Sequence, residues 1–201
     1  ESSAEIYFSS IPKFGVFGSS VDGASISIIS SDGGFYRSIN NGRSWELRSR
    51  QNEGLLKMES YKGSKYILTS GNKLLETSDF GKTWRDISPK EGGGSAKIKI
   101  FALDKATGAV AVLSDKIFFS QNGGASWREI NLLVPPGDLP IISVATFPSN
   151  SNIIYAASGK ILYKSNDGGS SWSIFEIPTT SNITALFADP KKPASLFIST
   201  Q

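Results

Sequence analysis

The sequence contains neither histidine nor cysteine among its 201 residues. Imidazole and thiolate groups are frequent metal ligands and common nucleophiles or acid–base groups near neutral pH. Their absence excludes a catalytic histidine or cysteine, a metal site built from either, any disulfide and a covalently attached c-type haem. Any catalysis would depend on oxygen-bearing side chains, lysine and arginine.

Charge is also scarce and dispersed. Charged residues make up only 19% of the chain, and 21 lysines and arginines against 18 aspartates and glutamates leave a formal net charge of +3. The basic residues are scattered singly apart from Lys191 and Lys192, so the sequence lacks the clustered positive charge typical of nucleic-acid binding. The longest apolar runs are too short and too polar to span a bilayer. We therefore expect no nucleic-acid partner and no membrane span.

The beginning of the chain lacks the basic start and apolar stretch of a secretory signal, which predicts a trimmed or excised chain. Hydrophobic residues make up 39% of the sequence and aromatic residues 11%, which is typical of a globular protein. A length of 201 residues suits one all-β domain with a single core.

One octapeptide occurs four times and contains all four tryptophans of the chain. Its pattern is Ser/Thr-x-Asp/Asn-x-Gly-x-Ser/Thr-Trp, and the tryptophans follow one another at intervals of 39, 43 and 45 residues. This spacing matches the ~40–45 residues of a four-stranded propeller blade. The first, third, fifth and eighth positions are Ser38, Asn40, Gly42 and Trp45; Thr77, Asp79, Gly81 and Trp84; Ser120, Asn122, Gly124 and Trp127; and Ser165, Asp167, Gly169 and Trp172.

Between these boxes, short β-type runs alternate with Gly, Asn, Asp and Pro, and no long stretch has a helical period. We predict an all-β fold, a β-propeller of four-stranded antiparallel blades in which each box forms the turn between the third and fourth strands. One domain is expected over residues 1–201. Its blades are predicted at residues 14–48, 55–88, 97–131 and 141–177, with a partial fifth blade at 182–201. Either residues 4–10 complete the fifth blade and close a five-bladed ring, or the chain is a slice of a larger propeller.

The polar box residues are interpreted as architectural. The third position alternates between Asn and Asp, and an amide oxygen accepts hydrogen bonds as a carboxylate does but is not a general base or nucleophile. Turn geometry is therefore favoured over catalysis, and the box tryptophans are expected to bury their rings against neighbouring blades. A Ca²⁺ site made of box oxygens is the alternative, but each box supplies too few carboxylates to close one. We expect no metal and no cofactor.

The octapeptide at this spacing resembles the Asp-box, or bacterial neuraminidase repeat, from residue 34 to residue 172. The resemblance implies a propeller fold and says little about function. Asp-box propellers occur in sialidases, xyloglucanases, sortilin-type receptors, photosystem II assembly factors and bacterial surface proteins.

The resemblance does not extend to the catalytic residues of sialidases. That family has an Arg-Ile-Pro near its start, where this sequence has Ser10-Ile11-Pro12, and an arginine triad that the dispersed arginines here do not match. A sialidase also needs six blades, and a xyloglucanase needs two facing propellers with a pair of aspartates. We therefore expect a non-enzymatic protein, with a fragment or relative of a carbohydrate-active enzyme as the alternative.

Ligands of propellers are expected on one face, where the loops between second and third strands and the loops between blades converge. The loop at 131–140 is apolar and stiffened by proline, which favours protein contact, although Leu132 and Val134 could also pack on the blade. Arg48 and Arg50 could clamp a carboxylate or phosphate, and residues 89–95 are expected to be flexible. The predicted ligand-contacting residues are Arg48, Arg50, Asp115, Leu133, Pro135 and Asp138.

The sequence thus predicts a binding or scaffold module that recognises a protein or a glycan through these loops, in a secreted, periplasmic or cell-surface location. An assembly factor of the photosystem II type is a further alternative, but it would be expected to have a concentrated arginine patch. The oligomeric state is left open.

Overall fold

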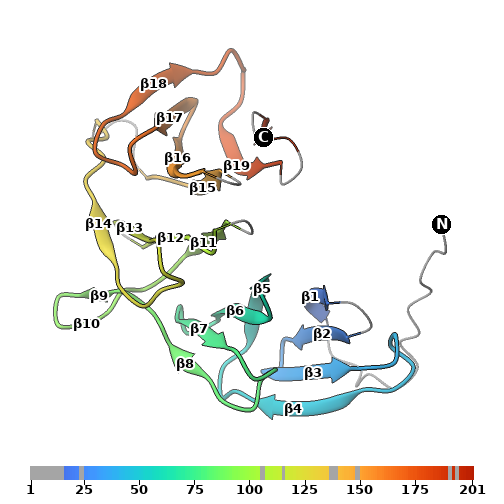
Figure 1. Ribbon diagram of the computed structural model, residues 1–201. Helices are drawn as coiled ribbons and strands as arrows, with labels where there is room; N and C mark the ends of the chain where they lie inside the picture. Colours follow the sequence, from blue (N-terminus) through green and yellow to red (C-terminus); the bar gives the residue numbers. More distant parts are fainter. Residues whose placement is uncertain are drawn as a thin grey trace. The chain divides into compact units, whose positions relative to one another are not determined.

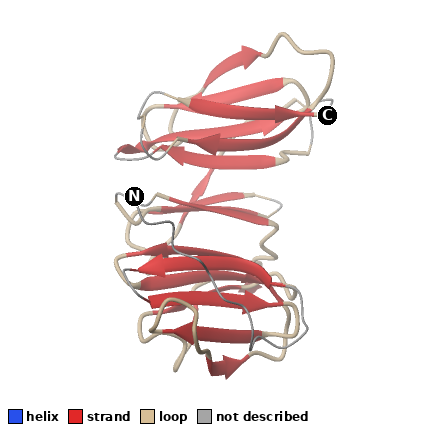
Figure 2. Cartoon of the chain, turned by 90° about the vertical axis from the view of Figure 1, so that its right-hand side faces the viewer, coloured by secondary structure: helices blue, strands red, loops and turns tan. Residues whose placement is uncertain are grey.

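The computed structural model describes residues 16–22, 25–104, 107–114, 116–135, 140–147, 150–189, 192 and 195–201. Within these residues, all regular secondary structure consists of β-strands (Figure 2). The described part therefore contains no helix that could cross a membrane. The chain divides into two compact units, Glu1–Ser88 and Pro89–Gln201.

The first unit contains two four-stranded antiparallel sheets, each with its strands in sequence order (Figure 1). The first blade consists of β1 (Val16–Asp22), β2 (Ser25–Ser30), β3 (Gly34–Ser38) and β4 (Glu46–Arg50). The second blade consists of β5 (Leu55–Tyr61), β6 (Ser64–Thr69), β7 (Leu74–Thr77) and β8 (Arg85–Asp86). Strand β4 ends two residues beyond the blade predicted at 14–48, and β8 ends within the blade predicted at 55–88. Residues 14 and 15 lie outside the described residues.

The second unit contains two further blades of the same topology and half of another. The third blade consists of β11 (Ile100–Leu103), β12 (Val110–Leu113), β13 (Ile117–Ser120) and β14 (Arg128–Ile130). The fourth consists of β15 (Ser143–Phe147), β16 (Asn150–Ser158), β17 (Ile161–Ser165) and β18 (Ser173–Glu176). A half-blade of β19 (Ile183–Ala188) and β20 (Leu196–Thr200) follows.

One short hairpin was not predicted. Residues 89–95, expected to be a flexible linker, contain β9 (Lys90–Glu91) paired with β10 (Gly94–Ser95). The turn between them has φ values of +57° at Gly92 and +87° at Gly93. Two successive left-handed residues make the tight hairpin turn that matches strand twist, and glycine adopts that conformation without steric cost.

Within each unit, the core lies between successive blades. In the first unit, Ile29 and Phe35 of the first blade pack with Leu55 and Ile67 of the second, and Trp84 covers the cluster. In the second unit, one apolar cluster joins the third and fourth blades and another joins the fourth blade to the half-blade. Each sheet thus buries a face against its neighbour, as sheets in layered all-β folds do.

The all-β class and the four-stranded antiparallel blades are confirmed, and the described residues form four complete blades and a partial fifth. The closing segment at residues 4–10 lies outside the described residues. Ring closure and the single-domain arrangement therefore stay predictions.

Candidate functional site

Each blade has two chemically different ends. At one end, here called the box end, the box connects the third strand to the fourth. At the other, here called the loop end, the second strand turns into the third and the fourth strand leaves for the next blade. Because neighbouring strands run antiparallel, the two kinds of connection lie at opposite ends of the strands of each sheet.

At the box end, the polar groups of the octapeptide bind one another. In the second blade, Thr77 Oγ1 donates to Asp79 Oδ1 at 2.8 Å and accepts the Gly81 N–H at 2.9 Å. The N–H of Thr83 donates to Asp79 Oδ1 at 3.0 Å. The other three boxes repeat this pattern, with Ser38, Asn40 and Gly42; Ser120, Asn122 and Gly124; and Ser165, Asp167 and Gly169.

The seventh box position explains how an amide replaces a carboxylate. Thr83 Oγ1 donates to Asp79 Oδ2 at 2.7 Å, whereas Ser44 Oγ accepts a hydrogen bond from Asn40 Nδ2 at 2.8 Å. A hydroxyl rotates to act as donor or acceptor. Both box types therefore satisfy the same turn.

The fifth box position packs against the preceding blade. Gly81 has φ +83°, and a Cβ there would lie 2.5 Å from the Phe35 ring. Gly169 has φ +93°, and a Cβ there would lie 2.7 Å from Ile130. Glycine is thus required both by backbone conformation and by close approach.

The box tryptophans differ in how their indole N–H groups are satisfied. Trp84 Nε1 donates to Ser49 Oγ at 2.9 Å, and its ring meets Phe35 edge to face with centroids 5.3 Å apart. Trp172 packs on the cluster between the third and fourth blades. The Nε1 atoms of Trp45 and Trp172 are buried without a hydrogen-bond partner in the described part of the chain, and Trp127 is half-buried.

Arginines of outermost strands connect one blade to the box of the next. Arg48 Nε donates to the carbonyl of Phe80 at 3.4 Å and Nη1 bonds Glu46 at 2.7 Å. Arg128 Nη2 donates to the carbonyl of Gly168, the same position of another box. Arg48 therefore lies at a box end, and the structure does not bring it together with Arg50 into one clamp.

At the loop end, a buried hydroxyl closes the second strand of every complete blade. Three of these hydroxyls bind the segment that enters their blade. Thr69 Oγ1 donates to Glu53 Oε2 at 2.5 Å, Ser114 Oγ donates to Glu91 Oε2 at 3.3 Å, and Ser158 Oγ donates to the Pro140 carbonyl at 3.0 Å. The fourth, Ser30, bonds Asp32 in its own turn.

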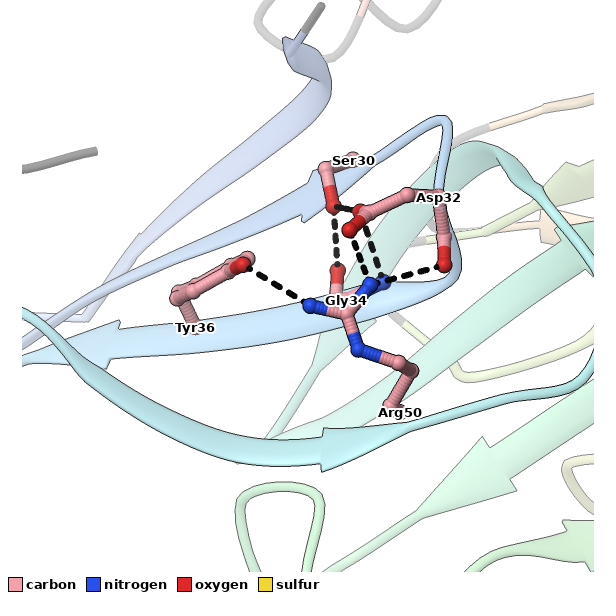
Figure 3. A network of polar contacts seen from close by, with 5 residues as sticks. All are labelled: Ser30, Asp32, Gly34, Tyr36 and Arg50. Carbon is pink, nitrogen blue, oxygen red and sulfur yellow. Dashed lines mark hydrogen bonds and ion pairs between the residues drawn. The ribbon is translucent and has the colours of Figure 1, made fainter. Parts of the chain in front are cut away.

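Arg50 belongs to this loop-end network of the first blade (Figure 3). Its Nη1 bonds the carboxylate of Asp32 and, at 3.1 Å, the Asp32 carbonyl, and Nη2 lies 3.5 Å from the Tyr36 hydroxyl. Burial opposes ionisation of Asp32, but hydrogen bonds from Ser30 and Arg50 outweigh it and lower its pKa. The guanidinium predicted to clamp a ligand thus neutralises an internal carboxylate.

Glu53 forms the equivalent network of the second blade. Lys73 Nζ donates to Glu53 Oε1 at 2.8 Å, and this bond, with that from Thr69, lowers the pKa of Glu53. An open pocket of about 300 Å³ adjoins this ion pair, between the loop at 51–53 and strands β7 and β8. The pocket has both an apolar wall and a polar rim.

The apolar loop of the second unit presents one leucine. Leu132 and Val134 pack on the cluster between the third and fourth blades, whereas Leu133 is 91% exposed. Pro135 is exposed beside them. The predicted ligand residues Asp115 and Asp138 lie outside the described residues. A ligand role for the predicted residues stays a prediction.

Nothing in the described ranges groups three or more acidic side chains into a set that could hold a metal ion. The clearly shifted carboxyl groups all have lowered pKa values. They are Asp32, Glu53, Asp79 and Asp167. Each is held in its ionised form by hydrogen bonds, as an acceptor in a turn or an ion pair is.

The residues predicted to contact a ligand include neither Glu53 nor the hydroxyls at the strand ends. A signal for the hydroxyls was present, because Ser30, Thr69, Ser114 and Ser158 all follow an apolar strand at corresponding places in the repeat. The groups that these hydroxyls bind show no comparable repeat in the sequence. Thr69 binds a glutamate side chain, whereas Ser158 binds a main-chain carbonyl.

No family model matches the chain. It is 26% identical over 118 residues to vacuolar protein sorting/targeting protein 10 of Schizosaccharomyces japonicus, a match covering 53% of this chain and 8% of that protein. It resembles the solved structure of an ancestral GH74 enzyme, with TM-score 0.63 and 20% identity over 92% of this chain and 27% of the enzyme. It also resembles YCF48 bound to D1 peptide, with TM-score 0.53 and 15% identity over 94% of this chain and 75% of that one. These likenesses show the β-propeller fold. The chain thus spans less than a tenth of the curated relative, and membership of the Asp-box family stays a prediction.

Proposed function

We propose that the chain is a non-catalytic β-propeller module that binds a protein through its loop-end segments, in an extracytoplasmic location. The observation that carries this proposal is Leu133, which is 91% exposed while its partly buried neighbours Leu132 and Val134 pack against the cluster between the third and fourth blades. Packing of the residues on both sides restricts the main chain at Leu133. A pre-ordered apolar group loses little conformational entropy when a partner covers it.

The electrostatics of the described carboxyl groups support a non-catalytic role. A glycosidase acid needs a raised pKa so that it remains protonated at neutral pH, together with a second carboxylate across the bond. Asp32 and Glu53 at the loop ends instead have lowered pKa values because Arg50 and Lys73 bind them. The likeness to YCF48 bound to D1 peptide supports a peptide as the form in which the partner is recognised.

The test is a random-peptide phage library selected on the full chain. Titration calorimetry would then compare selected peptides on the wild type, Leu133→Asp and Ile174→Asp. Ile174 is a matched control, because it is 63% exposed but lies on the outermost strand β18. We expect Leu133→Asp to weaken binding about tenfold or more, the cost of no longer burying a leucine, and Ile174→Asp to leave it unchanged. Failure to select any peptide, or equal affinity for Leu133→Asp and wild type, would contradict the proposal.

A further inference from the structure

The first unit has a pocket that the proposed protein-binding loop does not use. It measures about 300 Å³ and lies where the segment between β4 and β5 passes strands β7 and β8 of the second blade. Its lining includes Gln51, Asn52, Lys73, Leu75, Trp84 and Asp86. We propose that this pocket binds the ring of a neutral saccharide.

One side of the pocket is apolar and rigid. Trp84 is fixed by the hydrogen bond from Nε1 to Ser49 Oγ at 2.9 Å and by edge-to-face contact with Phe35. Leu75 lies beside it in the lining. A fixed indole and an aliphatic side chain provide the kind of surface on which the C–H face of a sugar ring packs.

The rim offers donors and acceptors with unused capacity. Lys73 Nζ donates one of its three N–H groups to Glu53. Asp86 Oδ1 accepts the Ser88 N–H at 2.9 Å. Asp86 Oδ2 and the side-chain amides of Gln51 and Asn52 have no hydrogen bond to any described residue. Each sugar hydroxyl both donates and accepts, so adjacent hydroxyls suit this mixed rim.

Charge narrows the ligand class. Lys73 interacts with two carboxylates, Glu53 and Asp86, so the charged groups that line the pocket carry one net negative charge. A net negative charge disfavours phosphates and carboxylates, and a cationic ligand would have to compete with the Lys73 ammonium for the same two carboxylates. The volume lies at the lower limit for small-molecule sites. One or two neutral sugar rings fit these conditions.

The test measures binding of defined sugars to the full chain. Saturation-transfer NMR and calorimetry would use lactose, maltose, cellobiose and chitobiose as neutral probes, 3′-sialyllactose as an anionic probe and Nα-acetyl-lysine amide as a cationic probe. Lys73→Met and Asp86→Ala remove rim groups. Lys116→Met is the matched control, because it removes a lysine paired to Glu129 at 2.9 Å in the other unit.

We expect at least one neutral disaccharide to bind, with about tenfold or greater weakening in Lys73→Met and Asp86→Ala and no change in Lys116→Met. Asn52→Ala, at an exposed loop residue, gives a second readout if a thermal melt shows that the other pocket variants are unfolded. No binding of any neutral probe, tighter binding of the charged probes, or equal effects of Lys73→Met and Lys116→Met would overturn the proposal. Leu133 is not among the residues that line the pocket. Leu133→Asp should therefore leave sugar binding unchanged, and failure of one proposal is distinguishable from failure of the other.

Discussion

Trp84 and Trp172 occupy the same box position but differ in whether the indole N–H makes a hydrogen bond. Substituting each by phenylalanine separates the effect of that hydrogen bond on stability from the effect of the ring. Trp84 Nε1 donates to Ser49 Oγ, whereas Trp172 Nε1 is buried with no partner among the described residues. Phenylalanine removes the N–H and the second ring in both cases. We expect Trp84→Phe to lower the free energy of unfolding more than Trp172→Phe does.

The magnitude follows from what each N–H does. The smaller ring leaves a similar void at both positions, so that cost largely cancels in the comparison. Loss of the Trp84 hydrogen bond costs about 1 kcal/mol, and removal of the unpaired Trp172 donor relieves about 1–3 kcal/mol of desolvation. The two variants should therefore differ by about 2 kcal/mol or more.

Urea unfolding followed by far-UV circular dichroism measures the total change in stability. Hydrogen exchange of the β6 and β16 amides reports the two units separately. Ser49→Ala provides a double-mutant cycle, with a cost of about 1 kcal/mol in the wild type and close to zero in Trp84→Phe. Equal losses in the two tryptophan variants, or the same cost of Ser49→Ala in both backgrounds, would refute the reasoning.

Two further predictions concern the boxes. Hydrogen bonds from Thr83 and Ser171 lower the pKa values of Asp79 and Asp167 below the ordinary 3.8, so the stability they contribute is complete above that pH and is lost as the pH falls below it. Thermal melts of the Asp79→Asn/Asp167→Asn double variant should match the wild type at neutral pH and fall less steeply between about pH 4 and pH 2; an unchanged acid dependence would contradict this. Gly81→Ala should cost about 1–3 kcal/mol more than Gly63→Ala. Both glycines have left-handed φ, but a Cβ at 81 meets the Phe35 ring at 2.5 Å and a Cβ at 63 meets nothing within 4 Å. Equal costs in urea unfolding would show that the turn does not pack tightly.

The features that sequence reasoning predicted are those set by local contacts. Ser165, Asp167 and Gly169 bind within one turn, so an eight-residue pattern locates the strands on both sides of it. The box was predicted to connect the third strand of a blade to the fourth, and this box lies between β17 (Ile161–Ser165) and β18 (Ser173–Glu176). The alternation of Asn and Asp at the third box position predicts that the turn uses an acceptor oxygen and does not need a carboxylate. Rotation of the Thr83 and Ser44 hydroxyls supplies the physical basis.

The candidate sites depend on contacts that no local pattern records. Glu53 meets Thr69 and Lys73 from sixteen and twenty residues away, across two turns. Arg48 and Arg50 do not form one clamp because they bind different partners, the carbonyl of Phe80 and the carboxylate of Asp32. The pairing of β3 with β4 also has a bulge between these two arginines. Residues 89–95 were predicted to be flexible, although they form a hairpin that turns at Gly92 and Gly93. Sequence alone does not separate these outcomes, because glycine permits both a flexible linker and a tight turn.

The two ends of the blades are under different chemical constraints. At the box end, the repeated polar groups bind one another, so they have little capacity left for a ligand. At the loop end, the same buried hydroxyl recurs but its partner changes from a glutamate at Thr69 to a main-chain carbonyl at Ser158. A constant anchor with variable partners lets each loop differ without altering the sheet beneath it. Binding specificity is therefore expected at the loop ends, where Leu133 and the pocket beside Lys73 both lie, and substitutions there should change ligands at less cost to stability than substitutions in the boxes.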